Sequence, residues 1–218
     1  MRVPENRQRT RKRIRPGTTE REECFLDQSE MLDAAICYAE LGFRIVPLWP
    51  GGKTPLPFPG AKEPTGDIER IGYWWELCPV ANIGLPTGVA YNSLIVIDLD
   101  LDSACGIDGR EELRRIISGS GLHLPETSVV RTGSGGEHYY FNNTKRIPLQ
   151  GKRNYCPGID VRAEGAHVVA PPSIHPNGRA YEWLCGSAHE IADATEDVYL
   201  LLEYLQAFAE DDPLRGWS

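Results

Sequence analysis

The clearest hydrophobic pattern in the sequence is the run SLIVIDLDLD at residues 93–102, in which isoleucines and leucines alternate with other residues. Successive side chains of a β-strand point to opposite faces of the sheet. The alternation therefore predicts a strand with one apolar face and one face that carries Asp98, Asp100 and Asp102. A strand that is buried on one side thus collects three carboxylates on the other.

The remaining apolar positions predict helices and strands in a mixed order. Helical spacing recurs in four segments: 29–43, 68–79, 109–121 and 196–210. Other short strands are predicted in 43–49, 128–141, 158–172 and 179–184. Ser29 is the candidate N-cap of the first helix, and Gly42 is its expected stop. Because no steady βαβ rhythm appears, we expect an α+β sheet with helices packed on it.

Composition narrows the class of protein. The chain has 218 residues, enough for a substantial core. Its apolar runs are shorter than the roughly 18 residues that span a bilayer, and its N-terminus is too basic for a signal peptide, so we expect a cytoplasmic protein with no membrane partner. Its cysteines form no CxxC pair, which argues against a zinc cluster or a disulfide framework. A net charge of -8 argues against a wholly basic nucleic-acid-binding surface but allows a local basic groove.

The first part of the chain, residues 1–28, is segregated by charge into a basic stretch, RQRTRKRIR, and an acidic one, TEREE. Such runs are typical of a disordered tail, and a basic arm that touches nucleic acid is the alternative. We expect the folded domain at 29–208. Residues 209–218 are then a tail or the start of a linker to a further domain.

The acidic strand suggests a metal site. Carboxylates two residues apart at a strand end would repel one another without a cation. Mg²⁺ prefers a few carboxylates together with phosphate oxygens and water, which points to phosphoryl chemistry. A calcium loop is excluded, because Ser103 stands where that loop needs glycine and Gly109 where it needs glutamate. A strand that runs into a polar turn capped by Asp102 remains the structural alternative.

The segment RTGSGGEHYYF, residues 131–141, provides a second candidate site. Its three glycines permit backbone conformations in which amides point into one concavity, a cradle for phosphate. His138 could donate a hydrogen bond to a phosphate oxygen, and Arg131 offers positive charge. The segment lacks the GK[ST] ending of a Walker loop, and its glycines lead to a strand, unlike a Rossmann fingerprint. A glycine-rich hairpin with a half-buried histidine is the alternative.

A third acid, Asp160 in GIDVRAEG, alternates with apolar residues and shares a strand face with Arg162. A structural ion pair and a further metal ligand are both consistent with this pattern.

In their order, the motifs NIGLPTG, VIDLDLD, VVRTGSGGEHYYF and GIDVRAEGAHVVAPPSIHPNGRAYEWL resemble the bifunctional primase-polymerase (Prim-Pol) family of the archaeo-eukaryotic primase superfamily. The GGKTPL loop, which precedes a WW pair, is also similar. The resemblance covers about residues 31–184. In that family two acids of a DxD motif and a third acid on a later strand hold two divalent metals. A histidine in the motif S-G-x-H-x-Y holds the phosphates of the incoming nucleotide.

The resemblance implies a role for each matching residue. Asp98, Asp100 and Asp160 are the expected catalytic residues and the ligands of Mg²⁺ or Mn²⁺. The expected nucleotide-binding residues are Lys53, Arg131, Ser134, Gly135, Gly136, His138, Arg162, Ser173 and His175; the last two could instead stabilise a turn. Two features depart from the family pattern. The glycine turn has one extra residue, and Ala166 and His167 stand where many relatives have Gly-Tyr, which leaves sugar or base selection near His167 open.

The implied architecture is an N-terminal α/β module packed on an RRM-like mixed sheet, with the catalytic cleft between them. The implied activity is DNA primase and DNA polymerase, by a two-metal mechanism, in the replication of a plasmid, phage or mobile element. Its partners would be a single-stranded DNA template, a primer, dNTP or NTP, and a helicase or accessory helical domain. Two other functions stay open: a non-catalytic nucleic-acid-binding replication module and a metal-dependent nuclease.

Overall fold

The computed structural model describes residues 28–102 and 104–210, and this part of the chain has an α+β fold, as predicted. Its helices are α1 (Gln28–Glu40), α2 (Ile68–Leu77), α3 (Gly109–Ser120) and α4 (Glu196–Glu210). The predicted charged tail and the predicted C-terminal tail lie outside the described residues, apart from the residues at positions 28, 209 and 210, which belong to helices. No helix in the described ranges is long and apolar enough to cross a membrane.

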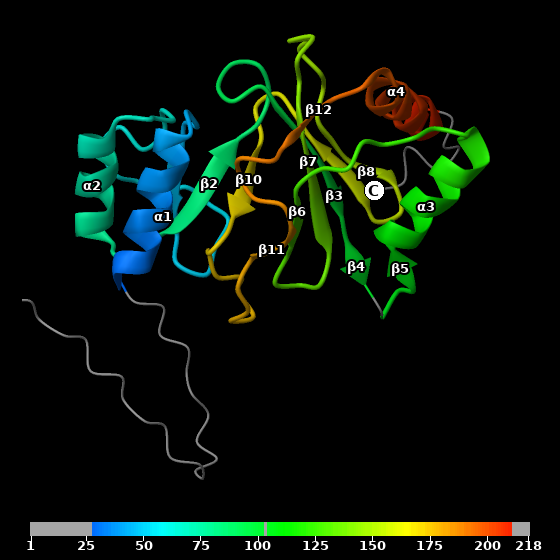
Figure 1. Cartoon of the computed structure of the whole chain (residues 1–218). Coiled ribbons are helices and arrows are strands. Elements are labelled where there is room, and N and C mark those ends of the chain that lie inside the picture. Colours follow the sequence, from blue (N-terminus) through cyan, green and yellow to red (C-terminus); the bar gives the residue numbers. More distant parts are fainter. Residues whose placement is uncertain (1–27, 103, 211–218) are drawn as a thin grey trace, which may run out of the picture.

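Two sheets lie next to each other, flanked by α1 and α2 on one side and by α3 and α4 on the other (Figure 1). The smaller sheet has the antiparallel order β1 (Val46–Leu48), β2 (Asn82–Pro86), β10 (His167–Ala170). The larger sheet has the order β11-β6-β7-β3-β9-β8, all antiparallel, with β12 parallel to β7. Its strands are β3 (Leu94–Leu99), β6 (Val129–Arg131), β7 (Glu137–Asn142), β8 (Lys152–Cys156), β9 (Ile159–Arg162), β11 (Glu182–Cys185) and β12 (Ala192–Asp193). Two short strands, β4 (Leu101–Asp102) and β5 (Ile107–Asp108), pair with each other.

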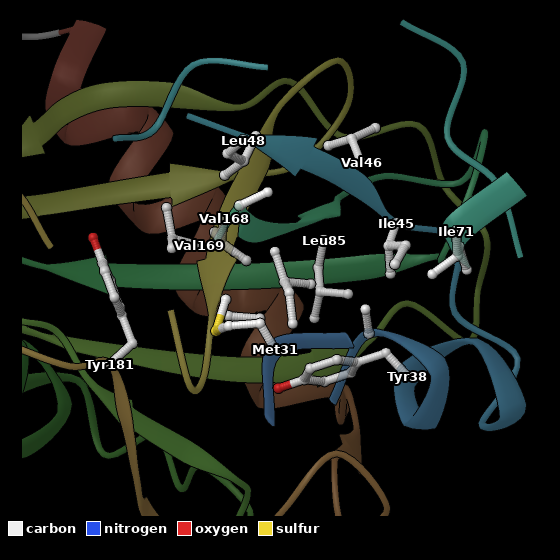
Figure 2. Packing of buried hydrophobic residues seen from close by; sticks show 14 of the residues in the cluster. Met31, Tyr38, Ile45, Val46, Leu48, Ile71, Leu85, Val168, Val169 and Tyr181 are labelled. Carbon is white, nitrogen blue, oxygen red and sulfur yellow. The ribbon is translucent and has the colours of Figure 1, made fainter. Parts of the chain in front are cut away.

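An apolar stripe on α1 explains how the N-terminal helix packs. Met31, Ala35 and Tyr38 are buried and lie three or four residues apart, so they share one helix face. They join a core with α2, the smaller sheet and one face of the larger sheet (Figure 2). The helix begins at Gln28, so Ser29 lies within it and the prediction of Ser29 as the N-cap is wrong. Gly42 follows the helix with a φ of 89°, as expected of a stop.

The larger sheet has a core on each face, and β3 runs through its middle. Leu94 and Val96 belong to the core shared with α1, whereas Ile95 and Ile97 belong to a second core under α3 and α4. Asp98 follows Leu94 and Val96 in the alternation and therefore lies on the face toward the smaller sheet. The prediction that Asp98 lies on the face opposite Ile95 and Ile97 is confirmed, but the expectation that only one side of the strand is buried is wrong, because Leu94 and Val96 bury the other face as well.

The predicted strand 93–102 is interrupted at Asp100. The Asp100 amide donates to the Gly158 carbonyl at 2.8 Å, and the Asp100 carbonyl accepts the Gly109 amide at 2.9 Å. These bonds tie the backbone to a neighbouring turn and to the start of α3, so β3 ends at Leu99.

Asp102 lies beyond this interruption, in β4, and is exposed. Its carboxylate accepts the amides of Ala104 at 3.0 Å and Cys105 at 3.2 Å. It therefore caps a polar turn, which was the structural alternative for the end of the acidic strand.

Candidate active site

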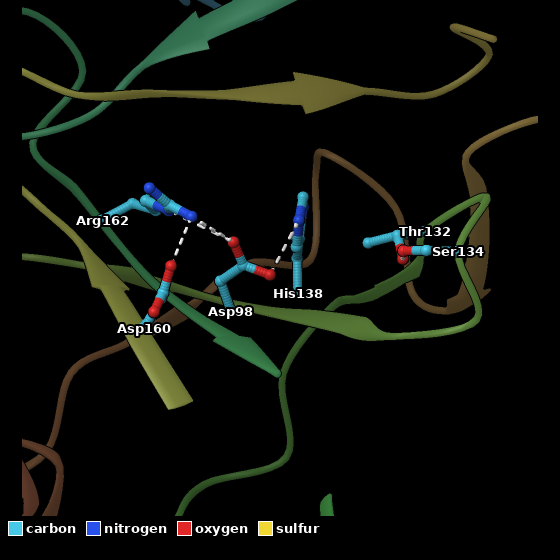
Figure 3. A network of polar contacts seen from close by, with 6 residues as sticks. All are labelled: Asp98, Thr132, Ser134, His138, Asp160 and Arg162. Carbon is cyan, nitrogen blue, oxygen red and sulfur yellow. Dashed lines mark hydrogen bonds and ion pairs between the residues drawn. The ribbon is translucent and has the colours of Figure 1, made fainter. Parts of the chain in front are cut away.

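Three neighbouring strands place His138, Asp98 and Asp160 in one row across the larger sheet. Asp98 on β3 is the register partner of His138 on β7 and also of Asp160 on β9. Directly opposed residues of antiparallel strands project from the same face, so the three side chains lie beside one another (Figure 3). Residues 22 to 62 positions apart in the sequence thus meet at one point.

Arg162 joins the two carboxylates of this row. Its Nη2 donates to Asp98 Oδ2 at 2.9 Å and to Asp160 Oδ2 at 2.6 Å, and its Nε donates to Asp98 Oδ2 at 3.1 Å. The side chains of Asp98 and Asp160 are only 11% and 5% exposed. Such carboxylates need a compensating charge, and the guanidinium supplies it.

His138 lies on the other side of Asp98. Its Nε2 is 3.3 Å from Asp98 Oδ1, whereas its Nδ1 is buried and has no hydrogen-bond partner among the described residues. The ring also lies near Tyr140 and Tyr181, with centroids 6.2 and 6.1 Å away. Leaving a buried ring nitrogen unpaired costs free energy, so Nδ1 is a position where a ligand atom would be stabilising.

The pKa values of Asp98 and Asp100 are shifted in opposite directions. Burial alone would raise the pKa of Asp98, but the neighbouring His138 and Arg162 outweigh it and hold this pKa well below its usual range. The pKa of Asp100 is raised, first by partial burial and then by the like charges of Asp98 and Asp160. The Asp100 carboxylate makes no hydrogen bond within the described residues. The site therefore concentrates negative charge beyond what Arg162 neutralises.

These side chains line a pocket of about 880 Å³. The larger sheet contributes Asp98, His138, Asp160 and Arg162, and Asp100 lies just beyond β3. The smaller sheet contributes β10, and the loop after β1 contributes three further residues: Lys53, Thr54 and Pro55. The structure thus brings together six of the residues that the sequence singled out: Lys53, Asp98, Asp100, His138, Asp160 and Arg162.

Four other predicted site residues, on and beside the glycine turn, do not line this pocket: Arg131, Ser134, Gly135 and Gly136. Arg131 pairs with Glu182 across β6 and β11 at 2.9 Å. The Ser134 hydroxyl bonds Thr132 Oγ1 at 2.9 Å, to one side of the acidic row in Figure 3. The predicted strand, glycine turn and second strand are confirmed, and the phosphate cradle stays a prediction.

Ser173 and His175 also lie outside the pocket lining. Ser173 is fully buried, and its hydroxyl accepts the Ile83 amide at 2.8 Å. His175 Nδ1 accepts the Asn177 amide at 3.3 Å, within a turn. These hydrogen bonds stabilise the loop after β10, and a role of either residue in nucleotide binding stays a prediction.

The model of the Prim-Pol family, described as bifunctional DNA primase/polymerase, N-terminal, matches residues 35–197. The chain belongs to this family. The matched region includes every strand of the described structure and the whole acidic row. No curated protein matches the chain at a significant level.

Two residues of this Prim-Pol site have no counterpart among the sequence predictions. Tyr181 lines the pocket, and burial together with Asp98 and Asp100 raises its pKa above the usual range. Glu164 also lines it and accepts the Val89 amide. Neither belongs to a motif with a spacing of its own, so only the tertiary structure reveals them. His167, noted as a departure from the family, lies in the pocket wall and its Nε2 bonds the Lys53 carbonyl at 2.8 Å.

The acidic side chains at this site are of the chemical type that binds divalent cations. The carboxylates of Asp98, Asp100 and Asp160 line one pocket, and hard oxygen donors are the ligands that Mg²⁺ and Mn²⁺ prefer. As arranged here, no three His, Cys, Asp or Glu side chains of the described residues form a cluster ready to hold a metal. Arg162 lies between Asp98 and Asp160 and donates to both carboxylates (Figure 3).

Proposed function

We propose that this chain is a template-dependent DNA primase and DNA polymerase that extends a primer by nucleotidyl transfer with Mg²⁺ or Mn²⁺. Membership of the Prim-Pol family suggests the activity. The observation that carries the proposal is the row His138–Asp98–Asp160, which stands beside Asp100 in a single pocket. A phosphate-binding histidine and three carboxylates are the groups that such a transfer requires.

Asp98, Asp100 and Asp160 would hold the metal ions. When bound, these ions activate the primer 3′-hydroxyl and neutralise the triphosphate and the departing pyrophosphate. His138 would orient the triphosphate. Nε2 would remain beside Asp98, while the unpaired Nδ1 would face a phosphate oxygen of the nucleotide. Lys53, which is exposed at the pocket wall, adds positive charge for the same phosphates.

Arg162 would change partners during loading. Its guanidinium holds the two carboxylates that a metal ion needs, so the ion and the guanidinium compete for them. Once released, the planar guanidinium is suited to bind two oxygens of a phosphate in the same pocket. Arg162 thus serves the nucleotide-free protein as an internal cation and the loaded protein as a triphosphate ligand.

The finer architecture belongs to the same proposal. The larger antiparallel sheet would be the RRM-like sheet, and the pocket would be the cleft between it and the N-terminal module, since β10 of the smaller sheet forms one wall. Residues 29–208 would form the catalytic domain. It would act in the cytoplasm on a single-stranded DNA template with a helicase or accessory helical domain, in the replication of a plasmid, phage or mobile element.

One observation favours a second candidate, a non-catalytic nucleic-acid-binding module. If Arg162 neutralised Asp98 and Asp160 permanently, the same contacts would be structural and no metal would enter. The two candidates differ in whether the acids support turnover.

The test is extension of a labelled primer on a single-stranded template with dNTPs and Mg²⁺ or Mn²⁺. Wild type should extend the primer, whereas Asp98→Asn and Asp100→Ala should each lose the activity. The Asp98→Asn change keeps the shape of the side chain, which limits the effect on folding. Asp102→Asn is the matched control, because Asp102 caps a turn and does not line the pocket. Absence of extension by wild type, with DNA binding retained, would instead favour the binding module.

A further inference from the structure

Asn82 ties together two loops at the end of the molecule where the acidic row lies. It is 1% exposed. Its Nδ2 donates to the carbonyls of Gly52 at 2.9 Å and Ile174 at 2.7 Å, and its Oδ1 accepts the Ile174 amide at 2.9 Å. The loop after β1 and the loop after β10 therefore keep fixed positions relative to each other. Figure 1 shows both loops at the same end of the fold as the β6–β7 turn.

Further hydrogen bonds, both within the loop and from β10, stabilise the loop after β1, residues 49–55. The Gly52 amide donates to the Trp49 carbonyl at 2.8 Å, and the Trp49 amide donates to the Thr54 carbonyl at 2.9 Å. His167 bonds the Lys53 carbonyl at 2.8 Å from β10. An ordered loop presents its side chains without a further entropy cost when a ligand arrives.

Trp49 stands on this ordered loop with 51% of its surface exposed. By contrast, Trp74 and Trp75 of α2 are almost completely buried. The contacts that Asn82, His167 and Thr54 make with the loop all use backbone atoms of the loop, so none of them accounts for the indole ring. A large flat apolar face thus lies in solvent four residues from Lys53, which lines the pocket.

Each of the two tied loops carries an exposed cation. Lys53 and Arg179 are exposed, and neither forms an ion pair with another described residue. Arg110, Arg115 and Arg131 are each paired with an acid, whereas Arg44, Lys62 and Arg70 are exposed without an ion pair, as Lys53 and Arg179 are. What distinguishes Lys53 and Arg179 is their position on the two loops that Asn82 joins, where a free cation can contact an anionic partner near the pocket.

We propose that Trp49 is a stacking platform for one base of the single-stranded template as the strand approaches the pocket, and that Arg179 contacts a phosphate of the same strand. This inference rests on the proposed polymerase function. Aromatic side chains stack on any base, and nearby cations bind the backbone, which is how single strands are held without sequence preference. Trp49 supplies the aromatic surface for a base, and Arg179 supplies the cation for the phosphate backbone.

The test measures binding of a labelled single-stranded oligonucleotide to the whole chain by fluorescence anisotropy. Trp49→Ala should weaken binding about 5- to 150-fold, the range seen for loss of one stacked base, and Trp49→Phe should retain most of the affinity. Arg179→Ala should reduce the slope of log K against log salt by about 0.7. Tyr73→Ala is the matched control, because Tyr73 is 48% exposed on α2 and does not line the pocket. Thermal melting checks that each variant is folded.

Kinetics separate this proposal from the proposed function. In primer extension, Trp49→Ala should raise KM for the primer–template and leave kcat and KM for the nucleotide near wild type. The platform is wrong if Trp49→Ala binds the oligonucleotide as tightly as Tyr73→Ala does, or if the change falls on KM for the nucleotide. If wild type extends no primer but still binds the oligonucleotide through Trp49, the polymerase proposal fails and the platform remains.

Discussion

Replacing Arg162 by glutamine should destabilise the protein when divalent cations are absent. The change leaves Asp98 and Asp160 adjacent, almost buried and without the guanidinium that they share. Removing one partner of a buried ion pair costs about 3–5 kcal/mol. Because His138 still lies beside Asp98 and the pocket opens to solvent, we expect the lower end, about 3 kcal/mol. For a domain of this size such a loss lowers Tm by about 6–12 °C.

The assay is thermal unfolding in EDTA and then in MgCl₂ or MnCl₂. An ion that takes the place of the guanidinium stabilises the folded state by about 2.7 kcal/mol at 100 times its Kd, which nearly offsets the loss. In wild type the same ion must first displace Arg162, so its Tm should rise less. Arg115→Gln is the control: Arg115 is 64% exposed and pairs with Glu112, and exposed pairs of this kind contribute at most about 1 kcal/mol.

The pH dependence of the Arg162→Gln effect has a defined sign. The pKa of Asp98 is depressed in the folded protein, since His138 and Arg162 outweigh the effect of burial. The stability that this carboxylate contributes is therefore present above the unfolded pKa of about 4 and is lost as pH falls below it. The Tm difference between wild type and Arg162→Gln should shrink below about pH 4. Equal Tm values in EDTA at neutral pH, or a variant that divalent cations do not rescue, would refute the assignment of Arg162 as the internal cation.

Three further predictions test the scaffold of the site. Asn82→Leu removes the hydrogen bonds to two loops and should cost about 2 kcal/mol or more in urea unfolding, so an unchanged midpoint would contradict the role given to Asn82. Gly136→Ala should be strongly destabilising, since its Cβ would lie 2.3 Å from the Leu99 carbonyl oxygen, whereas Gly119→Ala in α3 meets open space and should be neutral or stabilising. Burial raises the pKa of Cys156 to about 11, so at pH 8 a disulfide reagent should modify the exposed thiols first and Cys156 only after denaturation. Within residues 28–102 and 104–210, the exposed thiols are Cys37, Cys105 and Cys185.

Local patterns in the sequence predicted most elements because their causes are local. The alternation around Asp98 determines its face, and the spacing of Met31, Ala35 and Tyr38 determines the buried side of α1. The end of β3 could not be predicted in this way. It depends on hydrogen bonds from Asp100 to Gly158 and Gly109, and the periodicity of 93–102 contains no information about either partner.

The composition of the site followed from family resemblance, whereas its arrangement depends on strand register. Asp98 meets His138 and Asp160 because β3 lies between β7 and β9 in one particular register, and a shift of one residue would move Asp98 to the other face of the sheet. The link through Asn82 could not be predicted from the sequence either, because one buried side-chain amide joins positions 52, 82 and 174. No periodic pattern marks a single polar residue of this kind.

The pairing of Asp98 with Asp160 also resolves why one strand carries both an acid and a base. The sequence left a structural ion pair and a metal ligand as alternatives for Asp160, but the register makes them compatible. Two opposed carboxylates on neighbouring strands cannot both stay ionised in a nearly buried position without a cation. Arg162, two residues after Asp160 and on the same face, is the nearest place from which β9 can supply one. If these acids hold divalent ions, as we propose, they must be neutralised until the ions arrive, and Arg162 on the same strand would meet that requirement.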